Sequence, residues 1–157
     1  MNRREFMRSA AFLTAAGTLG HRIAAQETEQ GAAASMLIVD GCSPALLDEA
    51  YVEMLKTAGV TGWHKTLDVI QSFADAWNYV DRHPAEIRVA MTAAQIRNAH
   101  RAGIVAMIFG WQSADPLGAV AERNTTTLRA YYEMGLRIVN LVYNVTKLLA
   151  GGCLEPH

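Results

Sequence analysis

The sequence has little cysteine, little proline and no excess of charge of one sign, and each scarcity excludes a class of protein. Two cysteines without a CxxC pair cannot build a disulfide framework or a zinc finger. Four prolines and 12 glycines among 157 residues exclude collagen-like and low-complexity chains. A net charge of −1 provides no basic excess for a nucleic-acid partner. The chain is 51% hydrophobic and is therefore expected to fold around a buried core.

Residues 1–25 lack a long apolar run but have the layout of an export signal. A basic start leads into residues 10–19, which are mildly apolar, and then into small residues up to Ala25. The apolar run of about ten residues is too short for a membrane-spanning helix of about 20. Residues 3–8, RREFMR, are similar to the twin-arginine motif R-R-x-F-hydrophobic-K/R. The alternative interpretation is a basic amphipathic first helix.

We therefore expect a twin-arginine export signal over residues 1–25, a flexible lead-in over residues 26–35, and a periplasmic or secreted protein. No cysteine follows the apolar run, so neither a lipoprotein anchor nor any other membrane anchor is expected after cleavage. Twin-arginine export carries folded proteins, often with a cofactor already bound, which is compatible with a metal site.

Short apolar runs alternate with segments of helical periodicity along the rest of the chain. Strands are expected at 36–39, 60–66, 87–91, 104–109 and 136–143, and helices at 44–58, 69–83, 92–103 and 119–134. This alternation predicts parallel βαβ units, and the near-continuous apolar strands indicate a sheet covered on both faces. The fold class is α/β, although the pattern alone does not separate a barrel from a doubly wound sheet. No glycine-rich phosphate loop follows any of the strands.

In α/β folds the ligand binds beyond the carboxyl ends of the strands. Four places qualify here: Asp40 to Cys42, His64 to Thr66, Gln112, and Tyr143 with Asn144. Each also has a purely structural interpretation, as a loop cap, a packed side chain or a partner for loop backbone groups. There is no HExxH, GxSxG or closely spaced pair of carboxylates. The residues alone therefore indicate an exported α/β domain and assign no catalytic residue.

Three segments resemble the membrane dipeptidase (renal dipeptidase-like) metallopeptidase family. Residues 128–144, LRAYYEMGLRIVNLVYN, are similar to the family pattern L-R-x-x-Y-x-L-G-V-R-x-x-x-L-T-Y/H-N. Residues 152–155, GCLE, are similar to the G-D-G-C-x-E loop of bacterial members, and residues 39–41, VDG, match the start of the D-G-H-x-D motif. The resemblance covers residues 36–157.

The resemblance implies a (β/α)8 TIM-type barrel with two zinc ions at its carboxyl-end mouth. Such enzymes hydrolyse dipeptides, because zinc lowers the pKa of bound water and polarises the scissile carbonyl. On this basis we expect residues 36–157 to be the first half of a dipeptidase-like, metal-dependent hydrolase barrel. The implied activity is that of an exported, zinc-dependent dipeptidase-like hydrolase that cleaves dipeptides.

The sequence departs from the family at the metal-ligand positions that it covers. Cys42 stands where the family has histidine, Pro44 where it has aspartate, and Gln112 where it has the bridging glutamate. A thiolate can bind zinc, whereas proline cannot, and a neutral amide is a poor bridge between two cations. Cys42 and Gln112 are thus the predicted metal-site positions. The resemblance places Tyr143, Asn144 and His64 along the substrate cleft.

Residues 36–157 supply about four strands of an eight-stranded barrel. We expect them to be the N-terminal portion of a longer protein, inactive without the later strands and their two histidines. The other interpretation is a half-barrel that covers its open edge by forming a homodimer. Two functional alternatives also stay open: a non-catalytic binding module on the same barrel, and a different amidohydrolase-type barrel that shares only the fold.

Overall fold

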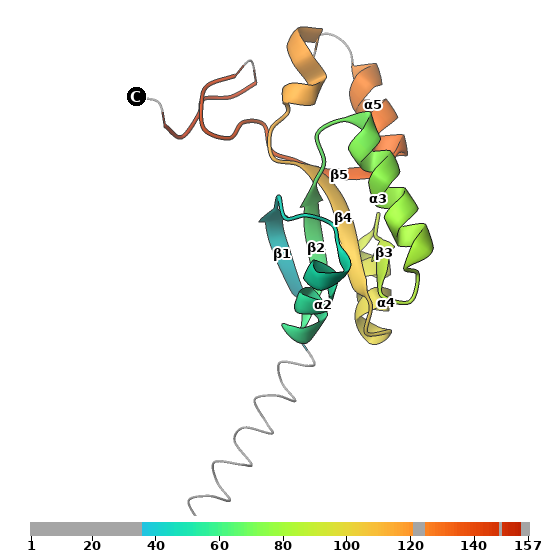
Figure 1. Cartoon of the computed structure of the whole chain (residues 1–157). Coiled ribbons are helices and arrows are strands. Elements are labelled where there is room, and N and C mark those ends of the chain that lie inside the picture. The colour runs from blue at the N-terminus through green and yellow to red at the C-terminus, as the bar shows by residue number, and fades with distance from the viewer. Residues whose placement is uncertain (1–35, 121–124, 148, 155–157) are drawn as a thin grey trace, which may run out of the picture. The chain divides into compact units, whose positions relative to one another are not determined.

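Strand β4 (Val105–Trp111) is the centre of a parallel sheet (Figure 1). The structure is a computed structural model that describes residues 36–120, 125–147 and 149–154. The predicted export signal (1–25) and lead-in (26–35) lie outside the described residues.

The described strands and helices alternate as the sequence predicts. The strands are β1 (Ile38–Ser43), β2 (Val60–Thr66), β3 (Ile87–Val89), β4 and β5 (Leu136–Val139). The helices are α2 (Glu49–Thr57), α3 (Ile70–Arg82), α4 (Ala93–Arg101) and α5 (Thr125–Glu133), with a 3-10 helix, η1, at Asp115–Val120.

All described strand pairs are parallel, in the order β1-β2-β4, and β4 has two partners on its other edge. Strand β3 pairs with residues 105–107 of β4, and β5 pairs with residues 109–111. Leaving out the short β3, the strands lie side by side in chain order and are joined through helices. This arrangement confirms the α/β class and is that of the N-terminal part of a TIM-type barrel.

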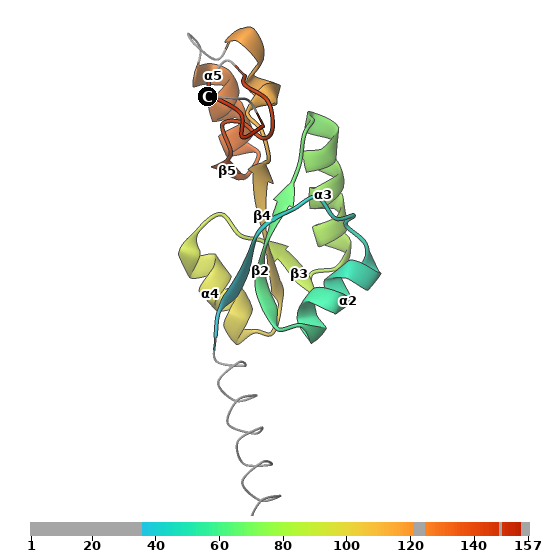
Figure 2. The same cartoon turned by 90° about the vertical axis from the view of Figure 1, so that its left-hand side faces the viewer.

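Strand β4 is buried at every residue, as expected for a continuous apolar run covered on both faces. Figure 2 shows α2 and α3 on one side of the sheet and α4 on the other. Alternate residues from Val105 to Trp111 join the main core, whereas Ala106 packs with Ala99 of α4 in a smaller cluster. The strand therefore divides its side chains between two layers.

Aromatic side chains join α3, β4 and α5. The Phe109 ring lies edge-on to Phe73, with centroids 5.5 Å apart, and to Trp77, with centroids 5.6 Å apart. The Tyr131 ring of α5 lies 4.6 Å from Trp111 and 5.5 Å from Phe73. These edge-to-face and tilted contacts add to the burial of the rings themselves.

Local chemistry accounts for several of the helix ends. Gly59 follows the end of α2 with a φ of 72°, and Thr92 with Gln95 forms a capping box at the start of α4. The prediction that Pro44 opens the first helix is wrong. Helix α2 begins after Asp48, whose carboxylate accepts a hydrogen bond from the Tyr51 backbone N–H at 2.8 Å.

Two predicted boundaries are also wrong, and a third falls partly on residues that the structure does not describe. The first strand, predicted as buried residues 36–39, extends from Ile38 to Ser43 and is largely exposed, because β1 pairs only with β2 among the described strands. Strand β5 ends at Val139, before the predicted end at residue 143. The predicted helix 119–134 is described as helix only from Thr125, and residues 121–124 lie outside the described residues. No described helix has the length and apolarity needed to cross a membrane.

We expect Phe109→Ala to lower the free energy of unfolding by about 3–5 kcal/mol, because it empties the space between α3 and β4. Met54→Ala on α2 is the matched control, since Met54 is 51% exposed, and its effect should stay within about 0.5 kcal/mol. Urea unfolding followed by circular dichroism measures both. Equal effects of the two substitutions would contradict this packing.

Candidate functional site

Three of the predicted functional positions lie at the carboxyl edge of the sheet. Cys42 is next to last in β1, Thr66 is the last residue of β2, and Gln112 directly follows β4. The Cys42 Sγ lies 3.8 Å from the Thr66 Oγ1. Thr66 is also paired in register with Gly110, two residues before Gln112. Parallel pairing thus brings these positions to one edge.

The segment that follows β1 is fixed over this edge by polar contacts. The Ser43 Oγ lies 3.0 Å from the Tyr51 Oη and accepts a hydrogen bond from the Ala45 backbone N–H at 3.2 Å. The Lys65 ammonium donates to the Ala45 carbonyl at 2.6 Å. Burial lowers the pKa of Lys65, and the nearby Asp68 carboxylate partly opposes this effect.

A cavity of about 480 Å³ opens beside Thr66 and Gln112. It runs between the loop after β1 and the side of α3. Its lining is mixed: apolar side chains form part of the wall, and charged or polar groups come from the end of β2 and from α3. The lining residues are Pro44, Leu47, Lys65, Thr66, Leu67, Asp68, Val69, Ser72, Asp75, Ala76, Tyr79, Arg82 and Gln112.

His64 is fully buried beneath the edge rather than lining the cavity. Its Nδ1 lies 2.6 Å from the Gly41 carbonyl oxygen, and its Nε2 has no hydrogen-bond partner among the described residues. The ring lies against Gly110, where an added Cβ would be only 1.9 Å from the Nε2. In this position His64 is a packing residue between β1 and β4, and its predicted contact with substrate stays a prediction.

Tyr143 and Asn144 lie in the loop after β5, not at a strand end. Asn144 organises this loop: its carbonyl accepts the Leu154 backbone N–H at 2.9 Å, and its side chain accepts from the Cys153 thiol at 3.6 Å. Tyr143 is 56% exposed. Neither lines the cavity beside Gln112, and both cysteines are free.

Sequence reasoning missed the α3 side of the cavity. Asp75, Tyr79 and Arg82 follow one another at intervals of four and three residues, the spacing that places side chains on one face of a helix. That spacing was visible in the sequence. However, polar residues on a helix face usually point to solvent. The tertiary structure shows that the loop after β1 lies opposite this face and forms the other side of the cavity.

The residues at the predicted metal positions do not fit a two-metal centre. Pro44 has no side-chain donor, Gln112 offers a single neutral amide oxygen, and the Cys42 thiol faces the Thr66 hydroxyl. Within the part of the chain that the structure describes, no three His, Cys, Asp or Glu side chains gather into a group that could hold a metal ion.

Comparison with known families identifies the chain. The profile of the membrane dipeptidase family (peptidase family M19) matches residues 22–157. The chain belongs to this family. The expected family is thereby confirmed. The chain is a member that has Cys42, Pro44 and Gln112 at positions where the family pattern has metal ligands.

A crystal structure of an amidohydrolase from Pseudomonas aeruginosa shares the fold. The two superpose with a TM-score of 0.71 at 21% sequence identity, and the match covers 79% of this chain. It covers 39% of the amidohydrolase chain, so the present chain spans well under half of that structure. No curated protein matches the sequence.

We expect Gly110→Ala to destabilise the protein strongly, because the new methyl group collides with the His64 ring. In a double-mutant cycle with His64→Ala, the losses of unfolding free energy in the two single variants should add up to more than the loss in the double variant. We expect the difference to be about 1–3 kcal/mol. Gly41→Ala is the matched control, since no atom lies within 4 Å of its added Cβ. Additive effects in the unfolding cycle would show that His64 does not pack against Gly110.

Proposed function

We propose that this chain belongs to a hydrolase that cleaves dipeptides at the carboxyl edge of its sheet. Membership of the membrane dipeptidase family over residues 22–157 supports the proposal. The cavity of about 480 Å³ beside Gln112 lies within the usual size range of small-ligand pockets.

The residues of this chain would bind and orient the peptide. The Thr66 hydroxyl and the Gln112 amide can each donate and accept a hydrogen bond, which suits a peptide group. The Lys65 ammonium donates a hydrogen bond to the Ala45 carbonyl and so holds the loop after β1 beside Thr66 and Gln112. Holding a substrate in one orientation is itself a large part of catalysis.

Zinc is the cofactor that the family implies, and when bound it would supply an activated water and a polarised carbonyl. Among the residues at the family positions, Cys42 is the one with a good zinc ligand. Pro44 and Gln112 do not complete a site, so the residues of this chain do not by themselves hold a two-metal centre. Zinc binding stays part of the proposal.

The second candidate is a binding module that holds a small peptide without cleaving it. A specific observation favours it: the described residues at the family metal positions include a proline and a neutral amide, which cannot hold two cations. Both candidates use the same edge of the sheet and the same peptide class of ligand.

Assays of the longer protein that the hydrolase proposal implies, with zinc and a panel of L,L- and L,D-dipeptides, separate the two, because this chain alone is proposed to be inactive. The hydrolase proposal predicts turnover, a loss of about tenfold in kcat/KM in Gln112→Ala through the lost substrate contact, and a lower zinc content in Cys42→Ser. Asn98→Ala, on the exposed face of α4, is the control and should change nothing. Peptide binding without turnover, with a zinc content that Cys42→Ser leaves unchanged, would establish the binding module instead.

We further propose that the protein is exported through the twin-arginine route and acts in the periplasm or outside the cell. The motif at residues 3–8 supports this proposal. Replacing Arg3 and Arg4 together by lysine conserves the charge and should stop export. Cell fractionation then finds the uncleaved chain in the cytoplasm, whereas the control Arg22→Lys is exported normally. Export of the double variant would contradict the proposal.

A further inference from the structure

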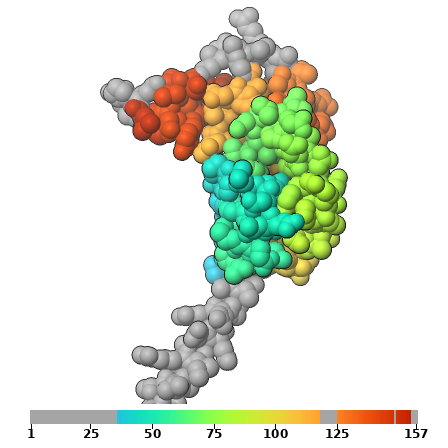
Figure 3. All heavy atoms as spheres, in the orientation of Figure 1, coloured from blue at the N-terminus to red at the C-terminus, as the bar shows by residue number. Residues whose placement is uncertain are grey.

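The cavity beside Gln112 continues into a groove between α2 and α3. A second cavity, of about 530 Å³, shares Leu47, Tyr79 and Arg82 with the first and reaches the start of α2. Figure 3 shows the surfaces of the loop after β1 and of α2 beside that of α3 on the face turned to the viewer. The two cavities together form an elongated groove on the helix-covered side of the sheet.

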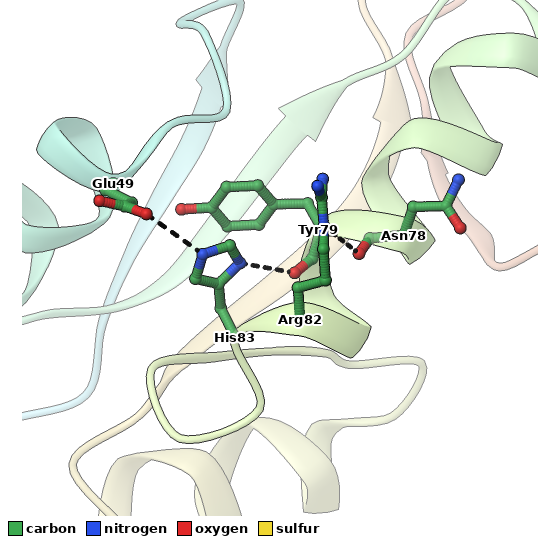
Figure 4. Close-up of polar contacts among 5 residues, drawn as sticks. All are labelled: Glu49, Asn78, Tyr79, Arg82 and His83. Atoms are coloured by element: carbon green, nitrogen blue, oxygen red, sulfur yellow. Dashed lines mark hydrogen bonds and ion pairs between the residues drawn. The ribbon is translucent and has the colours of Figure 1, made fainter.

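Tyr79 in the wall of this groove carries a polar group without a partner. The side chain is 8% exposed, and its hydroxyl has no hydrogen-bond partner among the described residues. Figure 4 shows the ring reaching from α3 toward α2, stacked on His83, which bridges the two helices through Glu49 at 3.4 Å. Burial, aided by the Glu49 carboxylate, raises the pKa of Tyr79, so the phenol stays protonated. A buried hydroxyl without a partner is costly unless a ligand supplies one.

Two charged groups of opposite sign, Asp75 and Arg82, line the same cavity as Tyr79. Arg82 uses its Nε on the Asn78 carbonyl, at 3.1 Å, and forms no ion pair with any described residue. Asp75 accepts one hydrogen bond, from the Gln71 amide at 2.8 Å, and likewise has no ion pair with a described residue. Each therefore keeps charge available for a ligand.

The separation of these two charges along α3 sets the length of the ligand. Asp75 and Arg82 are seven residues apart, two helical turns, which puts them on one side of the helix and about 10 Å apart along its axis. An extended peptide advances about 3.3–3.6 Å per residue, so three residues span about the same distance.

We propose that the groove between α2 and α3 binds a tripeptide by both of its charged ends. The peptide ammonium pairs with Asp75, the peptide carboxylate pairs with the guanidinium of Arg82, and the Tyr79 hydroxyl bonds to a peptide group between them. Leu47 and Ala76 provide the apolar wall for the central side chain. This site shares the cavity beside Gln112, but it is formed by side chains of α3 and of the loop after β1, and it needs no peptide-bond cleavage.

Calorimetric titration of the protein with Ala-Leu-Ala, its N-acetyl form and its C-terminal amide tests the proposal. Each blocked form should bind about tenfold or more weakly than the free tripeptide, because it lacks one charge-assisted contact. Asp75→Asn should weaken the free tripeptide by a similar factor but leave the N-acetyl form unaffected. Arg82→Gln should weaken the free tripeptide but leave the amide unaffected.

Tyr79→Phe keeps the ring and should weaken all three ligands. Glu53→Gln, on the outer side of α2, and Arg97→Gln, on α4, are the charge-matched controls and should change no affinity. Mass spectrometry after each titration records whether the peptide has been cleaved. Binding with intact peptide supports the groove even where the proposed hydrolysis fails.

Three results would overturn the proposal. The first is the absence of saturable binding of Ala-Leu-Ala. The second is an equal affinity for free and blocked peptides, which would show that the charged ends do not contribute to binding. The third is binding that is lost in Gln112→Ala but retained in Asp75→Asn and Arg82→Gln. This result would show that the peptide binds at the carboxyl edge of the sheet rather than along α3.

Discussion

Strand β4 is buried along its whole length and pairs with strands on both of its edges, and the other described elements are positioned against it. Its outward side chains, Phe109 and Trp111 among them, hold α3 and α5 through aromatic contacts. Its small residues allow close approach on the other face, where Gly110 leaves room for the His64 ring. Because β4 runs through the middle of the sheet, loss of its packing would disconnect both helical layers.

The same strand determines where functional groups can lie. Pairing of Thr66 with Gly110 places the end of β2 level with the end of β4, so the Thr66 hydroxyl and the Gln112 amide share one cavity. The bulge in β1 between Asp40 and Ser43 brings the Cys42 thiol to Thr66. These contacts are suited to holding a small polar ligand. They do not assemble the carboxylates and imidazoles that a pair of metal ions requires.

The proposed chemistry at this edge and the proposed binding in the groove between α2 and α3 depend on different features. The register of the strands determines which residues meet at the edge. The chemical groups available there are those of Cys42, Pro44 and Gln112. The groove lies between α3 and the loop after β1, which Ser43 and Lys65 hold in place, and in its wall the Tyr79 hydroxyl has no partner among the described residues. Residues at the family metal positions can therefore differ without altering the groove.

The sequence by itself determined the parallel α/β class, because the alternation of strand and helix periodicity is a local signal. It also predicted the core strand at 104–109, which the structure places at 105–111. The resemblance of residues 128–144 and two other segments predicted the family that the profile match over residues 22–157 confirms. Boundaries were less predictable: β1 extends past Asp40 and β5 ends at Val139, since pairing partners rather than composition decide where a strand ends. Only the tertiary structure decided that His64 is packed against Gly110 and that Asp75, Tyr79 and Arg82 face a second wall. Both depend on contacts between segments far apart in the chain, which no local pattern encodes.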